Sequence, residues 1–344
     1  MGEQGGQGRR FATSTSNRGR YKPVGGPVSS QRVAATSPVT MLTLRHRPHV
    51  RNFIAEFIGT FVLVAYGTGS GAQYILSNGT SATALSSVCT WGIGVAMGIY
   101  VSGGVSGGQL NPAVSVAYGV VGRLPWRKVP VYVAGQYLGS FCACCLVYLV
   151  YFEAMENFDG GSRQVLGPNG TAAIWATYPQ PFASVWTGLG DQVFSTGLLL
   201  LCMMAMSDPR NMMPNKGLYP IANGLLVIGL GLSFRLNCGN AMNPARDLAP
   251  RLFSAIAGWG LGPLSLRNYN WFWVNILGPH VGAVVGALAY QGCVGLHWPQ
   301  GFDNDEKLVA GSSDPQPLSD FVKDDEAPVI TDDGQWQHGS QPRI

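Results

Sequence analysis

The sequence predicts an all-α membrane protein with six transmembrane helices and two shorter re-entrant half-helices, arranged as an inverted repeat. Three observations support this prediction. Apolar stretches of roughly 20 residues, the length that a bilayer requires, recur six times. An Asn-Pro-Ala tripeptide occurs twice, at Asn111 and at Asn243, in segments that Gly and Pro interrupt. The 344 residues are 46% hydrophobic and only 12% charged, and the charged fraction is about half of the roughly 25% typical of soluble domains.

Both ends of the chain differ from its apolar middle. Residues 1–50 are rich in Gly, Ser, Arg and Pro without apolar periodicity, and we expect a disordered cytoplasmic tail with no cleaved signal peptide. Residues 298–344 are predicted to form an acidic disordered cytoplasmic tail. The first 51 residues hold nine Lys/Arg and one acid. A basic tail can indicate nucleic-acid binding, but beside a transmembrane span it more simply indicates a cytoplasmic location, so no nucleic acid is expected as a partner.

Between the tails, residues 51–297 are predicted to form one membrane domain of two repeats, residues 51–152 and residues 186–297. The predicted spans are residues 53–76, 84–101, 129–152, 188–206, 218–234 and 271–294. The fifth is short, and its place in the repeat favours a span over a core helix. Small residues at helical spacing are expected to let helices pack closely. They are Gly92, Gly94, Gly98, Gly278, Gly282 and Gly286.

Two apolar segments interrupted by Gly and Pro, residues 103–122 and residues 235–258, lie at equivalent places in the two halves. Irregular backbone at membrane depth is tolerated only where it is buried in protein or lines a wet cavity. Paired segments of this kind indicate a binding site or a pathway between them. In each segment an asparagine is predicted to cap a short helix that begins with proline. The capped starts are Asn111, Pro112 and Ala113, and Asn243, Pro244 and Ala245.

Basic residues predict the orientation. They precede the first and third spans and separate the fourth from the fifth, so the positive-inside rule places both termini in the cytoplasm. These residues are Arg45, Arg47, Arg51, Arg123, Arg127, Lys128, Arg210 and Lys216. The two Asn-x-Ser/Thr sequons, at Asn78 and Asn169, then fall in loops on the opposite side and are candidate glycosylation sites. We expect a multi-pass protein of the plasma membrane.

If the two half-helices enter from opposite faces, their N-termini meet near the bilayer centre, each with roughly half an elementary positive charge. Each asparagine can cap its helix through the side-chain oxygen and direct its NH₂ into the pathway. They could instead be caps alone, but two at matching places favour the pathway role. Arg246 is predicted to lie in the first turn of its half-helix, where the positive end of the helix dipole disfavours a cation. A residue placed against this local preference indicates a functional position. It could also pair with Asp247 or Glu56, although intramembrane ionisable residues usually face a cavity.

Each half also has an acid in the span upstream of its asparagine, Glu56 in the first and Asp191 in the second. We expect both to accept N–H bonds from the irregular loops. A proton relay is the alternative, and two acids without a chain of histidines make a poor one. The seven cysteines and five histidines match no disulfide framework or zinc spacing. No metal, cofactor or catalytic site is therefore expected, and we do not expect an enzyme.

The duplicated Asn-Pro-Ala motif, with Arg246-Asp247 after its second copy, resembles the aquaporin (major intrinsic protein) family over about residues 53–294. Asp247 marks the aquaglyceroporin branch, which conducts glycerol and small neutral solutes. The resemblance implies an aquaporin-like right-handed bundle in the lipid bilayer and a homotetramer with one pore per subunit. It also implies a selectivity constriction, formed here by Trp91, Gly231, Asn240 and Arg246. Water-selective members carry a histidine in place of Gly231 and a smaller aromatic in place of Trp91.

The resemblance implies that glycerol slides with its CH groups on Trp91 and its hydroxyls on Arg246. Three residues depart from it: Asn240 replaces an aromatic or apolar residue, Gln109 a histidine and Asn275 a proline. The predicted function is a passive channel for glycerol, water and small neutral solutes such as urea, excluding ions and protons. A water-selective pore is the alternative within this class. An ion-coupled transporter and an adhesion protein with a vestigial pore are the alternatives outside it.

Overall fold

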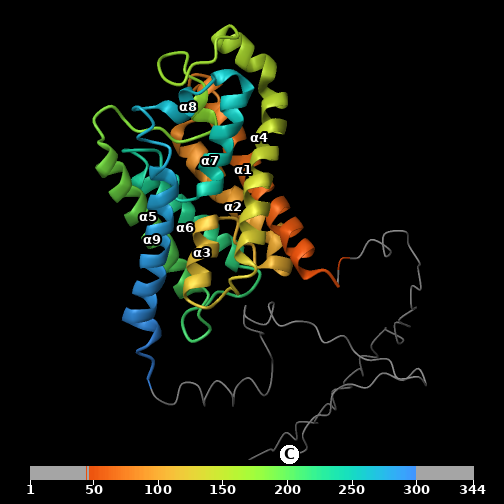
Figure 1. Ribbon diagram of the computed structural model, residues 1–344, viewed down its shortest axis with the longest axis vertical. Coiled ribbons are helices and arrows are strands. Elements are labelled where there is room, and N and C mark those ends of the chain that lie inside the picture. Colours follow the sequence, from red (N-terminus) through yellow and green to blue (C-terminus); the bar gives the residue numbers. More distant parts are fainter. Residues whose placement is uncertain (1–43, 45, 300–344) are drawn as a thin grey trace, which may run out of the picture. The chain divides into compact units, whose positions relative to one another are not determined.

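The protein is described here by a computed structural model that covers residue 44 and residues 46–299, so most of the two predicted tails lies outside the described residues. Six long helices and two half-helices form this part of the chain (Figure 1). They are α1 Pro48–Leu76, α2 Ala84–Ser106, α3 Pro112–Val120, α4 Val129–Asp159, α5 Val185–Met206, α6 Tyr219–Phe234, α7 Pro244–Ser254 and α9 Val274–Tyr290. Shorter helical segments are Ala172–Ile174, Ala255–Trp259, α8 Gly262–Ser265 and Gln291–Gly295. Apart from one isolated β-bridge, the described residues contain no strand.

The predicted fold class is confirmed, since every predicted span is a helix and each interrupted segment contains one half-helix. The boundaries differ at several ends. Helix α1 begins at Pro48, inside the residues assigned to the N-terminal tail, because proline is favoured in the first turn of a helix. Helix α4 continues beyond its predicted end to Asp159, where Gly160 in the left-handed conformation terminates it.

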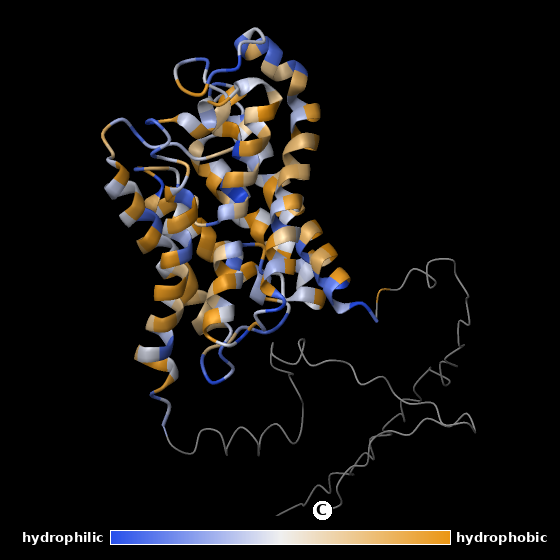
Figure 2. Ribbon diagram, viewed as in Figure 1, coloured by the Kyte–Doolittle hydropathy of each residue, from blue (hydrophilic) through white to orange (hydrophobic). Residues whose placement is uncertain are grey.

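The outside of the bundle is apolar. Helices α1, α2, α4 and α5 are long and apolar enough to cross a membrane, and the shorter α6 is apolar as well. Figure 2 shows hydrophobic helix surfaces between hydrophilic loops at the two ends of the bundle. Large apolar side chains such as Leu149, Val150, Phe194 and Leu225 are exposed on these surfaces. An apolar exterior of this extent requires an apolar environment.

Each half contains one pair of long helices that pack along each other. Helix α1 lies along α4 and helix α5 along α9, while α2 and α6 join the halves. A Cβ atom at Gly139 would lie 2.1 Å from the carbonyl oxygen of Phe57, and one at Gly282 would lie 2.3 Å from that of Val193. Only glycine allows these backbones to approach so closely. The six glycines predicted to serve packing behave likewise, because a Cβ atom at any of them would come within 2.9 Å of a neighbouring helix.

The half-helices enter from opposite ends. In Figure 1, α3 lies in the lower part of the bundle and α7 in the upper part. The start of α1, residues 121–128, residues 207–218 and the end of α9 lie at the lower end. The basic residues described in these segments thus share one end, and exposed Asn78 and Asn169 follow α1 and α4 at the other.

Candidate functional site

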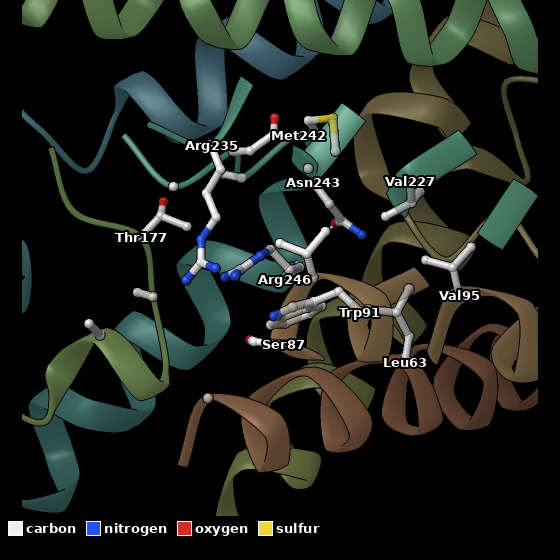
Figure 3. A pocket seen from close by; sticks show the side chains of 18 of the residues that line it. Leu63, Ser87, Trp91, Val95, Thr177, Val227, Arg235, Met242, Asn243 and Arg246 are labelled. Atoms are coloured by element: carbon white, nitrogen blue, oxygen red, sulfur yellow. Dashed lines mark hydrogen bonds between the residues drawn. The ribbon is translucent and has the colours of Figure 1, made fainter. Parts of the chain in front are cut away.

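A cavity of about 610 Å³ lies between the two half-helices and is lined from both halves of the chain. Its wall contains all of the residues predicted to form the pathway and the constriction: Trp91, Asn111, Gly231, Asn240, Asn243 and Arg246. Much of the remaining wall is apolar, including Leu63, Val95 and Val227 (Figure 3). The prolines and alanines of the two motifs are buried in the first turns of α3 and α7.

The two loops that precede the half-helices share an unusual backbone conformation. The residue before each asparagine is left-handed, with φ of +56° at Leu110 and +49° at Met242. Two residues earlier, Gly108 and Asn240 are left-handed as well, with φ of +62° and +59°. Asparagine tolerates this conformation better than most side-chain-bearing residues, which explains why it can occupy the position of a glycine. The matching conformations are a backbone signature of the repeat.

Both asparagines cap their half-helices. Asn111 Oδ1 accepts from the backbone N–H of Ala113 at 2.9 Å. Asn243 Oδ1 accepts from the N–H groups of Ala245 at 3.0 Å and Arg246 at 3.2 Å. Each cap satisfies donors that the first turn of a helix leaves without partners. The caps fix the side chains of both asparagines relative to their helix axes.

The amide nitrogens connect the two loops. Asn111 Nδ2 donates to the carbonyl oxygen of Met242 at 2.9 Å, and Asn243 Nδ2 donates to that of Leu110 at 2.8 Å. Each amide thus uses one of its two N–H groups on the opposite loop and retains the other for the pathway into which the NH₂ is predicted to point. The reason is that the left-handed residues turn their carbonyl groups toward the centre, where each needs a donor. These bonds also bring the two helix N-termini together.

Glu56 lies buried beneath the first loop. Its carboxylate accepts from four donors, two of which are backbone N–H groups of the loop. The donors are Ser106 Oγ at 2.5 Å, Gln109 N at 3.0 Å, Leu110 N at 2.8 Å and Gln136 Nε2 at 2.8 Å. Gln136 also donates to Ser115 Oγ in α3. Glu56 therefore contacts the loop backbone directly, and Gln136, which has no role in the sequence predictions, joins the carboxylate to the half-helix.

The second loop has a different partner from the one predicted. The backbone N–H of Met242 donates to Gln192 Oε1 at 2.9 Å and not to Asp191, whose predicted N–H bond from the loop segment comes from a side chain. Asp191 instead accepts from the side chain of Asn237 at 2.9 Å. One residue along a helix rotates a side chain by about 100°, so Gln192 and not its neighbour faces the loop. The spacing Gln192–Thr196, which repeats Glu56–Thr60, could have revealed this.

Arg246 lies over the indole ring of Trp91, with its guanidinium carbon 4.1 Å from the ring centroid (Figure 3). This is a close cation–π contact, and it covers part of the apolar wall that the resemblance assigns to a solute. The guanidinium Nη1 donates to the carbonyl oxygen of Trp175 at 3.4 Å and lies 3.9 Å from Asp247 Oδ2. The indole ring of Trp91 packs directly against Gly67, where a Cβ atom would come 2.3 Å from the ring.

Asp247 is buried and bonded mainly to groups other than Arg246. Its acceptor oxygens receive N–H and O–H bonds from a helix neighbour, a loop and the last span. The donors are Arg251 Nε at 3.0 Å, Thr177 N at 2.8 Å, Thr177 Oγ1 at 2.6 Å and Asn275 Nδ2 at 3.1 Å, and Arg251 Nη2 lies 2.9 Å from the carboxylate as an ion pair. Arg251, which is fully buried, was missed from the sequence, although its i+4 spacing from Asp247 indicates an ion pair. Asp247 thus ties α7 to the segment that contains Trp175.

Three polar or small residues complete the wall. Asn240 is buried, and neither its amide oxygen nor its nitrogen has a protein partner within the described part of the chain. The side-chain oxygen of Gln109 is likewise without a partner there. Buried polar atoms normally have hydrogen-bond partners, so a solute or water in the cavity can supply them. A Cβ atom at Gly231 would lie 2.7 Å from Val88 Cγ1, so a larger residue here would push into the cavity wall.

The described residues contain no group of three or more His, Cys, Asp or Glu side chains that could hold a metal ion. All seven cysteines are free thiols. Cys238, which is buried, receives an N–H bond from Gln192 Nε2 at 3.2 Å beside the second loop. The cavity wall is therefore built from hydrogen-bonding and apolar groups.

Comparison with known proteins identifies a family and several relatives that resemble this chain. The family model of the major intrinsic proteins matches residues 43–290. The chain is 44% identical over 298 residues to aquaporin-8 of Milnesium tardigradum, covering 87% of this chain and 86% of that protein. It is 46% identical over 247 residues to aquaporin-9 of Homo sapiens, covering 72% and 83%. Among solved structures, the aquaglyceroporin from Plasmodium falciparum matches with a TM-score of 0.65 at 32% identity, covering 72% of this chain and 100% of that chain.

Proposed function

The chain belongs to the major intrinsic protein family, and on this premise we propose that it is a passive, bidirectional membrane channel for glycerol, water and other small neutral solutes such as urea. The observation that carries the proposal is one cavity whose wall combines Trp91 and Arg246 with the two half-helix amides. Such a wall offers an apolar surface for CH groups and N–H donors for hydroxyls, which is what a small polyol needs. Relatives and a structural neighbour named as aquaporins and an aquaglyceroporin support the same class.

The polar groups of the wall have separate roles in this proposal. Arg246 and Asn240 bind solute hydroxyls at the constriction with Trp91 and Gly231. Asn111 and Asn243 each retain one N–H group after the bond to the opposite loop, and this group donates to the oxygen of a passing solute. Glu56, together with Gln192, holds the loops in place. Asp247 positions the segment beside the constriction.

Exclusion of ions and protons follows from the same arrangement. Each half-helix N-terminus contributes roughly half an elementary positive charge, and Arg246 adds a full one. The described residues that line the cavity include no carboxylate to offset these charges. A cation entering the centre is therefore repelled. A water molecule that accepts from both asparagines directs its own hydrogens outward, which interrupts a proton wire.

The setting of the channel is also part of the proposal. Residues 51–297 form the channel domain, both termini are cytoplasmic, and the protein lies in the plasma membrane as a homotetramer with one pore per subunit. Asn78 and Asn169, both exposed at the end opposite the basic loops, are glycosylation sites. The exposed apolar outer surfaces support contact with lipid and with other subunits. Permeation involves no chemical step, and we assign neither an enzymatic activity nor a cofactor.

A water-selective pore is the competing function, and stopped-flow light scattering on proteoliposomes separates the two. The double variant Gly231→His, Trp91→Phe should lower glycerol permeability roughly tenfold while water permeability stays within about twofold, because a methylene-scale change of fit is worth about 1–3 kcal/mol. The matched control is Gly229→Phe, since Gly229 is exposed on α6 and a Cβ atom there meets nothing within 4 Å. Unchanged glycerol permeability in the double variant, or none above protein-free vesicles in the wild type, would refute the proposal.

A further inference from the structure

A second arginine faces the cavity beside Arg246. Arg235 follows the last residue of α6 and lines the same cavity. Figure 3 shows its guanidinium group pointing toward that of Arg246. A purely structural explanation for the position of Arg235 is that a cation near a helix C-terminus is stabilised by the last carbonyl groups of that helix. Arg235 does not fit this explanation, because its Nη1 donates to the carbonyl oxygen of Ala84 in α2 at 3.1 Å.

The charges of these two arginines are not neutralised locally. The carboxylate nearest to Arg246 is Asp247 at 3.9 Å, and that group is already paired with Arg251 at 2.9 Å. No described carboxylate lies within ion-pair distance of Arg235. The two guanidinium groups also repel each other. Two like charges that face one space without an acid favour an anion between them.

The two guanidinium groups retain N–H donors for a ligand. A guanidinium group has five N–H donors, and only Nη1 of each arginine has an acceptor among the described residues. The wall around them also holds hydroxyl and amide groups. We call the part of the cavity lined by Arg235, Arg246, Ser87, Thr177 and Gln180 the arginine mouth. It joins a pair of cationic forks to neutral groups that can bind hydroxyls.

We propose that the arginine mouth binds a small hydroxycarboxylate of the glycerate class and that the bound anion blocks the pathway. Glycerate has a carboxylate in place of one CH₂OH group of glycerol. A carboxylate matches the guanidinium fork in a bidentate manner, with charge-assisted bonds about twice as strong as neutral ones. The remaining hydroxyls meet Ser87, Thr177 and Gln180. The binding site stands on the two arginines alone, whereas the block rests on the proposed function.

Isothermal titration calorimetry of the purified full chain with sodium glycerate tests the site. The wild type should bind glycerate in preference to chloride, and Arg235→Leu should weaken binding by roughly tenfold or more, the effect of losing a charge-assisted bond. Arg235→Lys should fall between them, since an ammonium group lacks the fork. Arg127→Leu removes the same charge from an exposed arginine at the other end and should bind as the wild type does. Equal binding by wild type and Arg235→Leu, or no preference over chloride, would overturn the site.

Glycerol permeability of proteoliposomes tests the block. Glycerate on the side of the arginine mouth should slow glycerol flux in the wild type, and the slowing should disappear in Arg235→Leu, each protein being compared with its own flux without glycerate. Full flux in wild-type vesicles saturated with glycerate would overturn the block. Absence of glycerol flux without any glycerate would instead refute the proposed function, and the calorimetric result would still decide the site.

Discussion

The two loops at the centre of the molecule have the same backbone but different supports. In the first half, the carboxylate of Glu56 accepts from two N–H groups of the loop. In the second half, the neutral amide of Gln192 accepts from one, at Met242. A buried carboxylate near the second loop is Asp247, which lies inside the half-helix and pairs with Arg251. The two repeats therefore share a loop geometry but place a buried carboxylate at different positions.

This difference separates a carboxylate that only supports a loop from one that lies beside the constriction. The charge of Glu56 lies beneath its loop and is used entirely on donors of the protein. The charge of Asp247 lies next to Arg246 and positions the Thr177 segment beside the constriction. The first half thus supplies one of the two asparagine amide donors, on a part of the cavity wall that has no charged group. The second half supplies the cations of the cavity. Variants that exchange or remove these supports can test this division.

The largest expected effect is the loss of Glu56. Glu56→Ala leaves two backbone N–H groups and one of the two amide N–H groups of Gln136 without acceptors, which should cost about 3–6 kcal/mol. We expect almost no folded protein in fluorescence-detected size-exclusion chromatography. Gln192→Ala removes the acceptor of a single N–H group and should give a folded protein with a lower melting temperature. Equal yields from the two variants would contradict the asymmetry between the loops.

The next effect concerns the charge of the second half. Asp247→Asn leaves fully buried Arg251 without its counter-charge, at a cost of about 3–5 kcal/mol. Its melting temperature should fall well below that of the wild type. The double variant Asp247→Leu, Arg251→Met removes both charges and should regain most of the lost stability. No recovery in the double variant would show that the pair serves something other than mutual compensation.

A smaller effect should follow from moving Trp91. Gly67→Ala places a methyl group 2.3 Å from the indole and should drive the ring into the cavity. Glycerol permeability should fall roughly tenfold, with water less affected, because overpacking of this kind costs about 1–3 kcal/mol. Gly69→Ala is the matched control in the same helix, since a Cβ atom there meets nothing within 4 Å. The two variants having the same glycerol permeability would argue against Trp91 as part of the constriction.

The smallest effect lies at the end of the bundle with the basic loops. Burial raises the pKa of Asp208, but hydrogen bonds from Arg210 and Tyr290 outweigh it and hold the pKa below its usual value. A lowered pKa stabilises the fold above the unfolded-state pKa of about 3.9, and this is lost as the pH falls through the folded-state value. Asp208→Asn should therefore melt earlier at neutral pH, by about 1–2 kcal/mol.

Melting curves recorded against pH check this last prediction. The gap between wild type and Asp208→Asn should stay constant from neutral pH down to about 5 and close only near and below about 4. A gap that closes near neutral pH instead would assign the effect to another group.

Much of this architecture was predictable because the repeat is visible as residues. Asn111 and Asn243, each followed by Pro-Ala, predict both half-helices and their caps. The placement of Glu56 followed from the need of an irregular loop for acceptors. The bonds between the loops were not predictable, since they depend on left-handed backbone at Leu110 and Met242, two residue types that give no sign of it.

The misplaced support in the second half has a similar cause. An acid in an apolar span is a stronger signal than an amide, so Asp191 attracted the prediction that belonged to Gln192. Arg235 was noticed only as the start of an interrupted segment, because its approach to Arg246 depends on how the end of α6 packs. Pairings across the fold are set by tertiary packing, which a single sequence does not reveal.

Glycerol flux through the purified protein, with and without ion gradients, tests the central claim most directly. If two opposed half-helices hold a passive pathway, glycerol permeability should exceed that of protein-free vesicles and be equal in both directions. It should also be unchanged when proton and sodium gradients are abolished. Flux that appears only with an ion gradient, or no flux above protein-free vesicles, would contradict the account.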